Sequence, residues 1–498
     1  MKRTFLFIAF FLIISSTWSQ SLSLTKKQMY QDFDQLTNII KEGNPQIEAR
    51  KMVTGINQIK MIENLRSRIE TISSDEEFNK LLKQALSYVL DDHSRETKTF
   101  YSGVDNLKNI DTNSIKQQQG FTSLDQERFP IGAEYYDDCY FFLGNHYLIH
   151  KNRKDTIHIQ CMRLISFDGQ DFGKYVEENY TPSNYDYLRR KYYRDWVSLP
   201  NAGIIKGEQS GKIIEFDIED YNGRILSGRI TDKIYDVILD KVPYAKFPFE
   251  FDKVKKVEYF IGDSILYIYM DKMVEDESFC NKIKETGRDK YIKKVVIDVR
   301  SNKGGSDYAW WNVLKAIAKD TLSYEVKLAY NDNKMMRERF KGYSNQEKGE
   351  IDYLGNKPFR FINGTFQLVP DSNSLNFEGK IFILADRHTY SAGFSLVNCA
   401  EQVDQLVSIG EPSGQIRGCG VAPQLFQLKH SKFTFRLACV MDVYNANKAI
   451  DLYKDFPEII IIPDFRESMI YPRVAFDIKS KRYLKWYDAM YRTVLYFK

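Results

Sequence analysis

The sequence has no marked excess of charge of either sign. Its 498 residues include 71 Lys and Arg against 67 Asp and Glu, a formal net charge of +4. Since a surface that follows a phosphate backbone usually needs a clear basic excess, nucleic acid is not expected as the main partner. Hydrophobic residues make up 43% and charged residues 28%, which excludes wholesale disorder and allows a large core.

Cysteines are few, and none of them forms a C-x-x-C pair. A zinc or redox site of that kind is therefore not expected. The even number leaves disulfides open, but their scattered positions indicate no pairing; these are Cys139, Cys161, Cys280, Cys399, Cys419 and Cys439.

After residue 20, no apolar run approaches the length of about 20 residues that a membrane-spanning helix needs. At the N-terminus, Lys2 and Arg3 precede an apolar run over residues 5–14, and small polar residues follow. This order predicts a secretory signal peptide at residues 1–20. No cysteine lies near the cleavage point, so a lipid anchor is not expected. We therefore expect an exported protein, periplasmic or extracellular.

The remaining chain divides into four parts. Residues 21–119 show the apolar spacing of three and four that is typical of helices, and residues 120–250 hold short β-like runs with turns. In residues 251–475 strands alternate with helical stretches, and residues 476–498 form a C-terminal segment. The third part is predicted to be α/β, because most of its strand candidates are continuous apolar runs; the candidates are 264–270, 293–299, 380–386 and 406–410.

Two of these strands end in turns that could carry chemistry. The segment 298–306 contains the paired glycines Gly304 and Gly305, which allow positive φ and let backbone N–H groups point at a ligand. The segment is therefore either a binding site for an anion or oxyanion, or a plain turn from strand to helix. In residues 386–394, Ser391 begins a helix. A serine there either caps the helix, which the pattern alone favours, or acts as a nucleophile beside the positive helix N-terminus.

Histidine is scarce, with six in the chain, and His93 stands in a polar turn at residues 91–94 directly after a predicted helix. A single histidine in such a place is more often solvated than catalytic. By itself it indicates no function.

Taken together, these segments resemble the C-terminal-processing (tail-specific) serine peptidases, in the branch similar to tricorn protease and interphotoreceptor retinoid-binding protein. The segments that carry the resemblance, each followed by the family's pattern in parentheses, are 298–305 (D-x-R-x-N-x-G-G), 380–400 (a strand and a T-x-S-A turn), 409–414 (G-E-P-T-G), 91–94 (D-G-H-T), 164–169 (I-x-S-I-N-G) and 462–464 (a late P-D element). This chain itself reads I-G-E-P-S-G at 409–414, D-D-H-S at 91–94 and L-I-S-F-D-G at 164–169. The resemblance implies a ClpP/crotonase-like α/β catalytic domain, an N-terminal helical segment and a small β-rich, PDZ-like module.

The resemblance also implies roles for single residues. Ser391 would be the nucleophile of an acyl-enzyme mechanism, and the N–H groups of Ala392 and of Gly304 or Gly305 would form the oxyanion hole. Peptides or proteins would be the substrate, and no metal or organic cofactor is required.

The general base is where this chain departs from part of the family. Members with a Ser–Lys dyad carry the lysine just past the G-E-P-T segment, but this chain has Ile416 and Arg417 there, and a guanidinium stays protonated. The resemblance to tricorn-like members therefore implies His93 as the base, with His388 as a rival. Asp455 and Glu458 are the candidates for an orienting carboxylate.

Other departures leave alternatives open. Asp92 and Lys303 stand where the family usually has glycine, and residues 394–395 replace an acidic residue. A non-catalytic ligand- or peptide-binding protein on the same fold is the main alternative. A crotonase-like thioester enzyme is a weaker one, because the predicted signal peptide argues against coenzyme A chemistry. Substrate specificity is expected to lie in residues 120–250 and in loops such as 330–353.

Overall fold

The computed structural model describes residues 24–91, 93–97, 255–355, 357–412, 416–418, 420–421, 423–453, 456–463, 467 and 479–497, and short pieces between 132 and 230. The predicted signal peptide at residues 1–20 lies outside these residues. Within the part of the chain that is described, no helix is long and apolar enough to cross a membrane.

The N-terminal part is helical, as predicted. It contains α1 (Lys26–Gly43), α2 (Gln46–Thr54), α3 (Gln58–Asn64), the 3₁₀ turn η1 (Arg66–Thr71) and α4 (Asp75–Ser87). Helix α1 starts at a capping box on Thr25 and ends at Asn44, just before a proline, and α4 starts where the Ser74 hydroxyl accepts the Glu77 N–H. These caps fix where the two helices begin.

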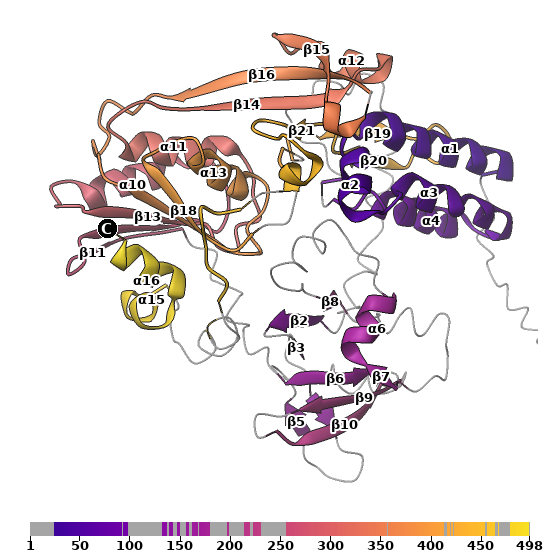
Figure 1. The fold of residues 1–498 in the computed structure, drawn as a ribbon, viewed down its shortest axis with the longest axis horizontal. Helices are drawn as coiled ribbons and strands as arrows, with labels where there is room; N and C mark the ends of the chain where they lie inside the picture. The colour runs from indigo at the N-terminus through magenta and orange to yellow at the C-terminus, as the bar shows by residue number, and fades with distance from the viewer. Residues whose placement is uncertain are drawn as a thin grey trace, which may run out of the picture.

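Residues 132–230 contain the predicted short strands. The elements are β2 (Gly132–Tyr136), β3 (Cys139–Phe142), β4 (Tyr147–Ile149), β5 (Thr156–His158), β6 (Arg163–Phe167), β7 (Gln170–Asp171), α6 (Phe172–Asn179), β8 (Val197–Ser198), β9 (Ile214–Glu219) and β10 (Ile225–Ile230). Six of the strands form a path in the order β10-β9-β6-β3-β2-β8, with β7 paired to β6, while β4 and β5 pair with each other. Figure 1 shows this sheet with α6 as a separate body in magenta.

The centre of the α/β part is a six-stranded sheet in the order β11-β12-β13-β17-β18-β22. Its strands are β11 (Lys256–Phe260), β12 (Ile265–Tyr269), β13 (Lys294–Asp298), β17 (Ile381–Ala385), β18 (Leu406–Gly410) and β22 (Ile459–Ile460). All pairs except β11–β12 are parallel. The four strands predicted in this region are confirmed, and the central ones are buried on both faces.

Helices cover both faces of this sheet (Figure 1). One face packs against α10 (Glu277–Gly287), α11 (Asp307–Ile317) and α13 (Ala392–Ala400). The other packs against α15 (Lys481–Tyr487) and α16 (Ala489–Tyr496), which place Leu484, Met490 and Tyr491 on the sheet. The C-terminal segment is therefore part of the α/β layer structure.

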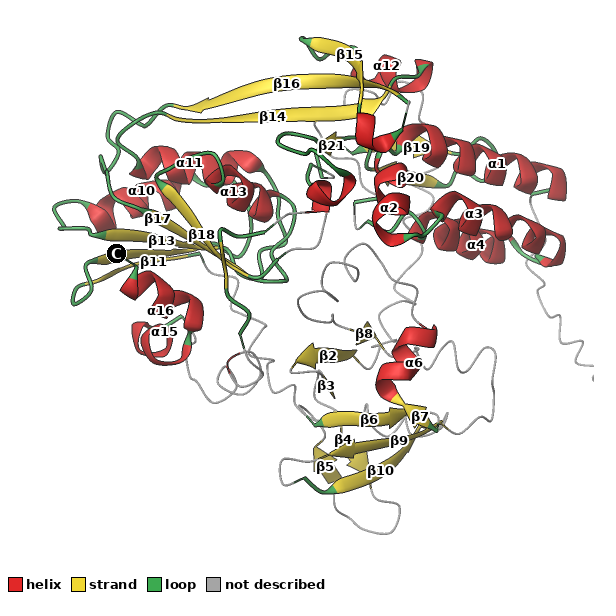
Figure 2. Ribbon diagram, viewed as in Figure 1, coloured by secondary structure: helices red, strands yellow, loops and turns green. Residues whose placement is uncertain are grey.

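A second sheet, in the order β15-β16-β14-β21, lies beside the first. It consists of β14 (Leu322–Asn331), β15 (Gln346–Glu350), β16 (Pro358–Leu368) and β21 (Met441–Asp442). Figure 2 shows β14 and β16 as a long ribbon that runs from above α11 toward the N-terminal helices. The prediction of a loop at 330–353 is wrong: this stretch holds the end of β14, α12 (Lys334–Phe340), β15 and the turn η5 (Asp352–Leu354). The residues of β15 are polar and mostly exposed, so the sequence shows no apolar alternation there that would predict a strand.

Three short strands join the N-terminal helices to the rest of the molecule. They are β1 (Arg95–Glu96), β20 (Thr434–Leu437) and β19 (Gln424–Gln427), in the order β1-β20-β19. Apolar side chains of α1, α3 and α4 share one core with β14, α12, β19 and β20. A last 3₁₀ turn, η6 (Ala449–Tyr453), packs against α2 in a neighbouring cluster. The N-terminal helices are thus anchored on elements far later in the chain, and Arg95 of β1 pairs with Arg436 of β20.

Four of the cysteines lie in the described part of the chain: Cys139, Cys280, Cys399 and Cys439. Of these, Cys280, Cys399 and Cys439 are buried free thiols. Burial raises the pKa of Cys399 and of Cys439 to about 12, so both stay protonated and unreactive. They act as small apolar side chains of the core.

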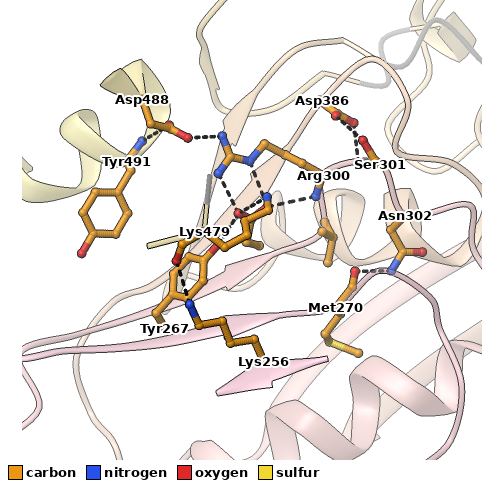
Figure 3. Close-up of polar contacts among 12 residues, drawn as sticks. Lys256, Tyr267, Met270, Arg300, Ser301, Asn302, Asp386, Lys479, Asp488 and Tyr491 are labelled. Atoms are coloured by element: carbon orange, nitrogen blue, oxygen red, sulfur yellow. Dashed lines mark hydrogen bonds and ion pairs between the residues drawn. The ribbon is translucent and has the colours of Figure 1, made fainter. Parts of the chain in front are cut away.

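A buried ionic network joins the end of β13 to the C-terminal helices (Figure 3). The Asp298 carboxylate is fully buried and accepts from Tyr267 Oη (2.6 Å), Lys479 Nζ (3.0 Å) and Arg300 Nε (2.9 Å) and Nη2 (2.6 Å). Arg300 also pairs with Asp488, which caps α16 by accepting the Tyr491 N–H. Two cations and two carboxylates therefore compensate one another at this strand end.

The network keeps the buried Asp298 carboxyl ionised. Burial by itself raises the pKa of Asp298, but Arg300 and Lys479 outweigh burial and hold the pKa below its ordinary value. A carboxyl group whose pKa is depressed in the folded state contributes stability above its unfolded pKa of about 4, and this stability is lost as the pH falls further.

We expect Asp298→Asn to lower the free energy of unfolding by about 3–5 kcal/mol, because the isosteric amide leaves two cations of the network, Arg300 and Lys479, facing the single carboxylate of Asp488. Urea unfolding at neutral pH measures the loss. The control is Glu76→Gln, which removes an exposed pair with Lys80 and should change stability by less than about 0.5 kcal/mol. Equal stability of the two variants would contradict a structural role for the Asp298 charge.

Candidate active site

Ser391 occupies a strained turn between β17 and α13. Its backbone has φ +56° and ψ −126°, a region that non-glycine residues rarely adopt and that costs about 1–3 kcal/mol. Although Ser391 stands at the N-cap position of α13, its hydroxyl makes no capping hydrogen bond. The plain capping role that the sequence pattern favours is therefore not what this serine does.

The turn that carries Ser391 is fastened to the end of β13. The Thr389 hydroxyl donates to the Val299 carbonyl (2.9 Å), and the Tyr390 N–H donates to the Asn302 carbonyl (2.8 Å). In return, the Asp386 carboxylate accepts the N–H and the hydroxyl of Ser301, at 2.8 and 3.0 Å (Figure 3). The two turns predicted from the sequence thus form one hydrogen-bonded unit.

Two glycines bring the β13 turn against the nucleophile turn. Gly304 has φ +87°, and a Cβ there would lie 2.5 Å from Ser391 Cβ. Gly305 has φ +146°, and a Cβ there would lie 2.1 Å from the Met273 carbonyl oxygen. Both contacts are too close for any side chain, so only glycine fits at either position.

The same turns leave two N–H groups available near Ser391. The Gly304 N–H donates to Asn302 Oδ1 (2.8 Å), and Asn302 is itself fully buried with its amide held by the Met270 carbonyl (2.8 Å). The N–H groups of Gly305 and Ala392 donate no hydrogen bond to any residue that the structure describes. Of the three predicted oxyanion donors, Gly305 and Ala392 therefore have an open N–H, whereas Asn302 occupies that of Gly304.

His93 is held by the turn that follows α4. The Asp91 carboxylate accepts the N–H groups of His93 (2.9 Å) and Ser94 (2.6 Å) and the Ser94 hydroxyl (2.8 Å). The same hydroxyl accepts the Ala438 N–H (3.0 Å), just past β20. These bonds fix the backbone on both sides of His93.

A buried arginine supports this turn from α2. Arg50 is 1% exposed, donates to the Val89 carbonyl (2.6 Å), and lies 3.7 Å from the Asp91 carboxylate. Directly after the turn, Arg95 pairs with Arg436 in the β1–β20 ladder. The N-terminal helices and β20 together carry His93 to the edge of the α/β sheet.

The structure brings His93 and Ser391 together. His93 Nε2 lies 3.2 Å from Ser391 Oγ, and the side chain of His93 is almost fully buried. Gly420 closes the other side: a Cβ there would lie 2.6 Å from His93 Nε2 and 3.2 Å from Ser391 Oγ. Sequence reasoning missed Gly420, although it falls shortly after the G-E-P-T-like segment.

The surroundings keep His93 neutral. Burial, reinforced by the positive charges of Arg436 and Arg95, lowers the pKa of His93 to about 3. At neutral pH the imidazole is therefore unprotonated and can accept a proton.

Tyr390 contacts the opposite edge of the imidazole. Its hydroxyl oxygen lies 2.6 Å from His93 Nδ1, and the two rings are within 16° of parallel. Sequence reasoning did not single out this residue, since nothing in the turn motif distinguishes the position before the serine.

The other predicted residues lie as follows. The His388 N–H donates to Asp386 Oδ1 (3.0 Å), and its carbonyl accepts from Lys303 Nζ (3.3 Å). The Glu458 N–H donates to Ser408 Oγ (2.8 Å), just before β22. Asp455 lies outside the described residues. Orientation of His93 by Asp455 or Glu458 stays a prediction. Among the described residues, no group of three or more His, Cys, Asp or Glu side chains is arranged to hold a metal ion.

Comparisons with known proteins bear on this geometry. Two solved structures of mature CPAF, one of them complexed with lactacystin, resemble the chain with TM-scores of 0.55 and 0.56. They are 12% and 11% identical to it, with 94% of this chain covered in both cases and 97% and 98% of the CPAF chains. At such identity the likeness shows the fold alone. A search of curated protein sequences finds no match.

The model of peptidase family S41 matches residues 264–447. This range contains Ser391, the turn with Gly304 and Gly305, and Gly420, whereas His93 lies outside it. The predicted relationship is thereby confirmed for the α/β part: residues 264–447 belong to peptidase family S41, the C-terminal-processing serine peptidases.

Proposed function

We propose that the protein hydrolyses peptide bonds through an acyl-enzyme, with Ser391 as the nucleophile and His93 as the general base. The observation that carries the proposal is the 3.2 Å contact between Ser391 Oγ and His93 Nε2, beside the open N–H groups of Gly305 and Ala392. A nucleophile, a base and two convergent donors are the groups that acyl transfer requires.

In the proposed reaction, Ser391 Oγ attacks the scissile carbonyl carbon while its proton passes to His93 Nε2. The N–H groups of Gly305 and Ala392 donate to the oxyanion, and the N-terminus of α13 adds a favourable dipole. His93 then gives its proton to the leaving amine, and the acyl-enzyme forms. Water, deprotonated by His93, releases the second product and restores Ser391.

The finer parts of the proposal are supported by the sequence and by the arrangement of helices and strands. Residues 1–20 support export to the periplasm or the cell exterior, and the strand–turn–helix of β6, Gly169 and α6 supports a PDZ-like module that binds substrate peptides. The layers of helices around a mostly parallel sheet support the ClpP/crotonase-like type of catalytic domain.

We expect Ser391→Ala to abolish peptide hydrolysis and labelling by a fluorophosphonate probe, because no other oxygen nucleophile is proposed in the site. His93→Ala should lower kcat by several orders of magnitude, roughly 10³–10⁴-fold, through loss of the base. Turnover of a casein or peptide-library substrate and gel-based probe labelling measure both effects. Unchanged turnover in Ser391→Ala refutes the assignment, and a folded wild type that the probe never labels favours a non-catalytic binding protein.

The pH profile tests the state of His93. Since the pKa of His93 is lowered to about 3, the base is unprotonated well below neutrality, and kcat/KM should stay level from pH 8 down to about pH 5 before it falls. Circular dichroism at each pH distinguishes the fall of kcat/KM at low pH from acid unfolding of the protein. An acid limb centred near the ordinary histidine pKa of about 6.5 would contradict the buried, arginine-flanked environment.

We expect Gly420→Ala to lower kcat/KM by about 100-fold, because its methyl group would displace the imidazole from Ser391, and a shift of about 1 Å has such an effect. Gly342→Ala is the matched control, since no atom lies within 4 Å of a Cβ at that position. Similar kcat/KM values for the two variants would show that a side chain at position 420 does not displace His93 from Ser391.

A further inference from the structure

The hydroxyl of Tyr390 is placed to act on the base rather than on the substrate. It lies 2.6 Å from His93 Nδ1, while His93 Nε2 faces Ser391 Oγ at 3.2 Å. The imidazole is thus contacted at both nitrogens by consecutive residues of one turn. Because the Tyr390 N–H is held by the Asn302 carbonyl and its carbonyl accepts the Gly393 N–H (3.1 Å), the backbone that carries both groups is fixed.

The direction of the hydrogen bond between His93 Nδ1 and the Tyr390 hydroxyl decides whether His93 Nε2 can accept the proton of Ser391. A neutral imidazole carries one proton, so one nitrogen donates and the other accepts. If the Tyr390 hydroxyl donated to Nδ1, the proton would sit on Nε2, and Nε2 could not accept the proton of Ser391. If the Tyr390 oxygen accepts from Nδ1–H, the lone pair of Nε2 faces Ser391. Only the second arrangement supports general-base catalysis.

We propose that Tyr390 is the positioning residue of this site: its phenol oxygen accepts the Nδ1–H of His93 and thereby selects the tautomer whose Nε2 lone pair faces Ser391. The inference rests on the proposed function, in which His93 is the base. In this role Tyr390 acts through the imidazole and not on the substrate. In the transition state the same bond is retained by the imidazolium, which donates from Nδ1.

A phenol is an acceptor suited to this environment. Arg95 and Arg436 contribute positive charge around His93, and the imidazole is almost fully buried. The neutral hydroxyl orients the ring through a short hydrogen bond without adding a charge that must also be buried. The nearly parallel packing of the two rings adds a steric restraint on imidazole rotation.

The first test is the tautomer of His93 in the full-length wild-type protein, measured by NMR with ¹⁵N-labelled histidine. His93→Gln identifies the His93 signals among those of the six histidines. At neutral pH we expect a protonated Nδ1 and an unprotonated Nε2. A proton on Nε2 overturns the proposal without any substitution at Tyr390.

The second test is Tyr390→Phe, which keeps the ring and removes the oxygen. We expect kcat to fall about 10- to 100-fold, KM to stay within about twofold, and the His93 signals to shift toward the Nε2–H tautomer. The matched control is Tyr259→Phe, which removes a hydroxyl that donates to the Tyr291 carbonyl (2.6 Å) on the edge strand β11 and should leave kcat and tautomer unchanged. Thermal melting checks that both variants fold.

The outcomes separate this inference from the proposed function. Wild-type kcat in Tyr390→Phe, or a lower kcat with an unchanged tautomer, overturns the positioning role even when Ser391→Ala is inactive. Unchanged turnover in Ser391→Ala instead refutes the peptidase mechanism, whatever Tyr390→Phe does.

Discussion

The parallel pairing of β13 with β17 is the interaction on which the rest of the site depends. Their register sets Asp298 beside Leu384, so both strands end at the same edge of the sheet and their turns meet there. Asp386 and Asn302 then fasten one turn to the other. The buried charges around Asp298 fix the end of β13, and glycine at position 304 lets its turn approach Ser391 closely.

The histidine reaches this edge by a different route. It lies outside the segment that matches the peptidase family, in a turn after an N-terminal helix, and it depends on a two-residue strand paired with β20 and on the Asp91 carboxylate. Burial of this junction explains two properties together. It holds the imidazole at the nucleophile, and it lowers the pKa of the imidazole so that the ring is neutral. The same burial makes the orientation of the ring depend on a hydrogen-bond partner such as Tyr390.

Much of the fold could be predicted because it follows from local patterns. Apolar runs marked the four central strands, and apolar spacing of three and four marked the N-terminal helices, since both patterns depend on neighbouring residues. The stretch 330–353 was mispredicted because β15 is polar and mostly exposed, so its residues lack the apolar alternation that marks a strand. The occupation of the Gly304 N–H by Asn302 and the approach of Gly420 to His93 depend on contacts in space, which a linear pattern does not contain.

The sequence by itself determined the α/β class of the central part, the two turns at strand ends, and the resemblance that singled out Ser391, because residue type and spacing along one segment suffice for these. Only the tertiary structure decided which histidine stands at Ser391, which N–H groups are open and what contacts Nδ1. The physical reason is sequence separation. His93 lies 297 residues before Tyr390 and 298 residues before Ser391, and only packing and strand pairing bring these side chains within hydrogen-bond distance. Neither the near-balanced charge nor the positions of the histidines in the sequence indicate such contacts.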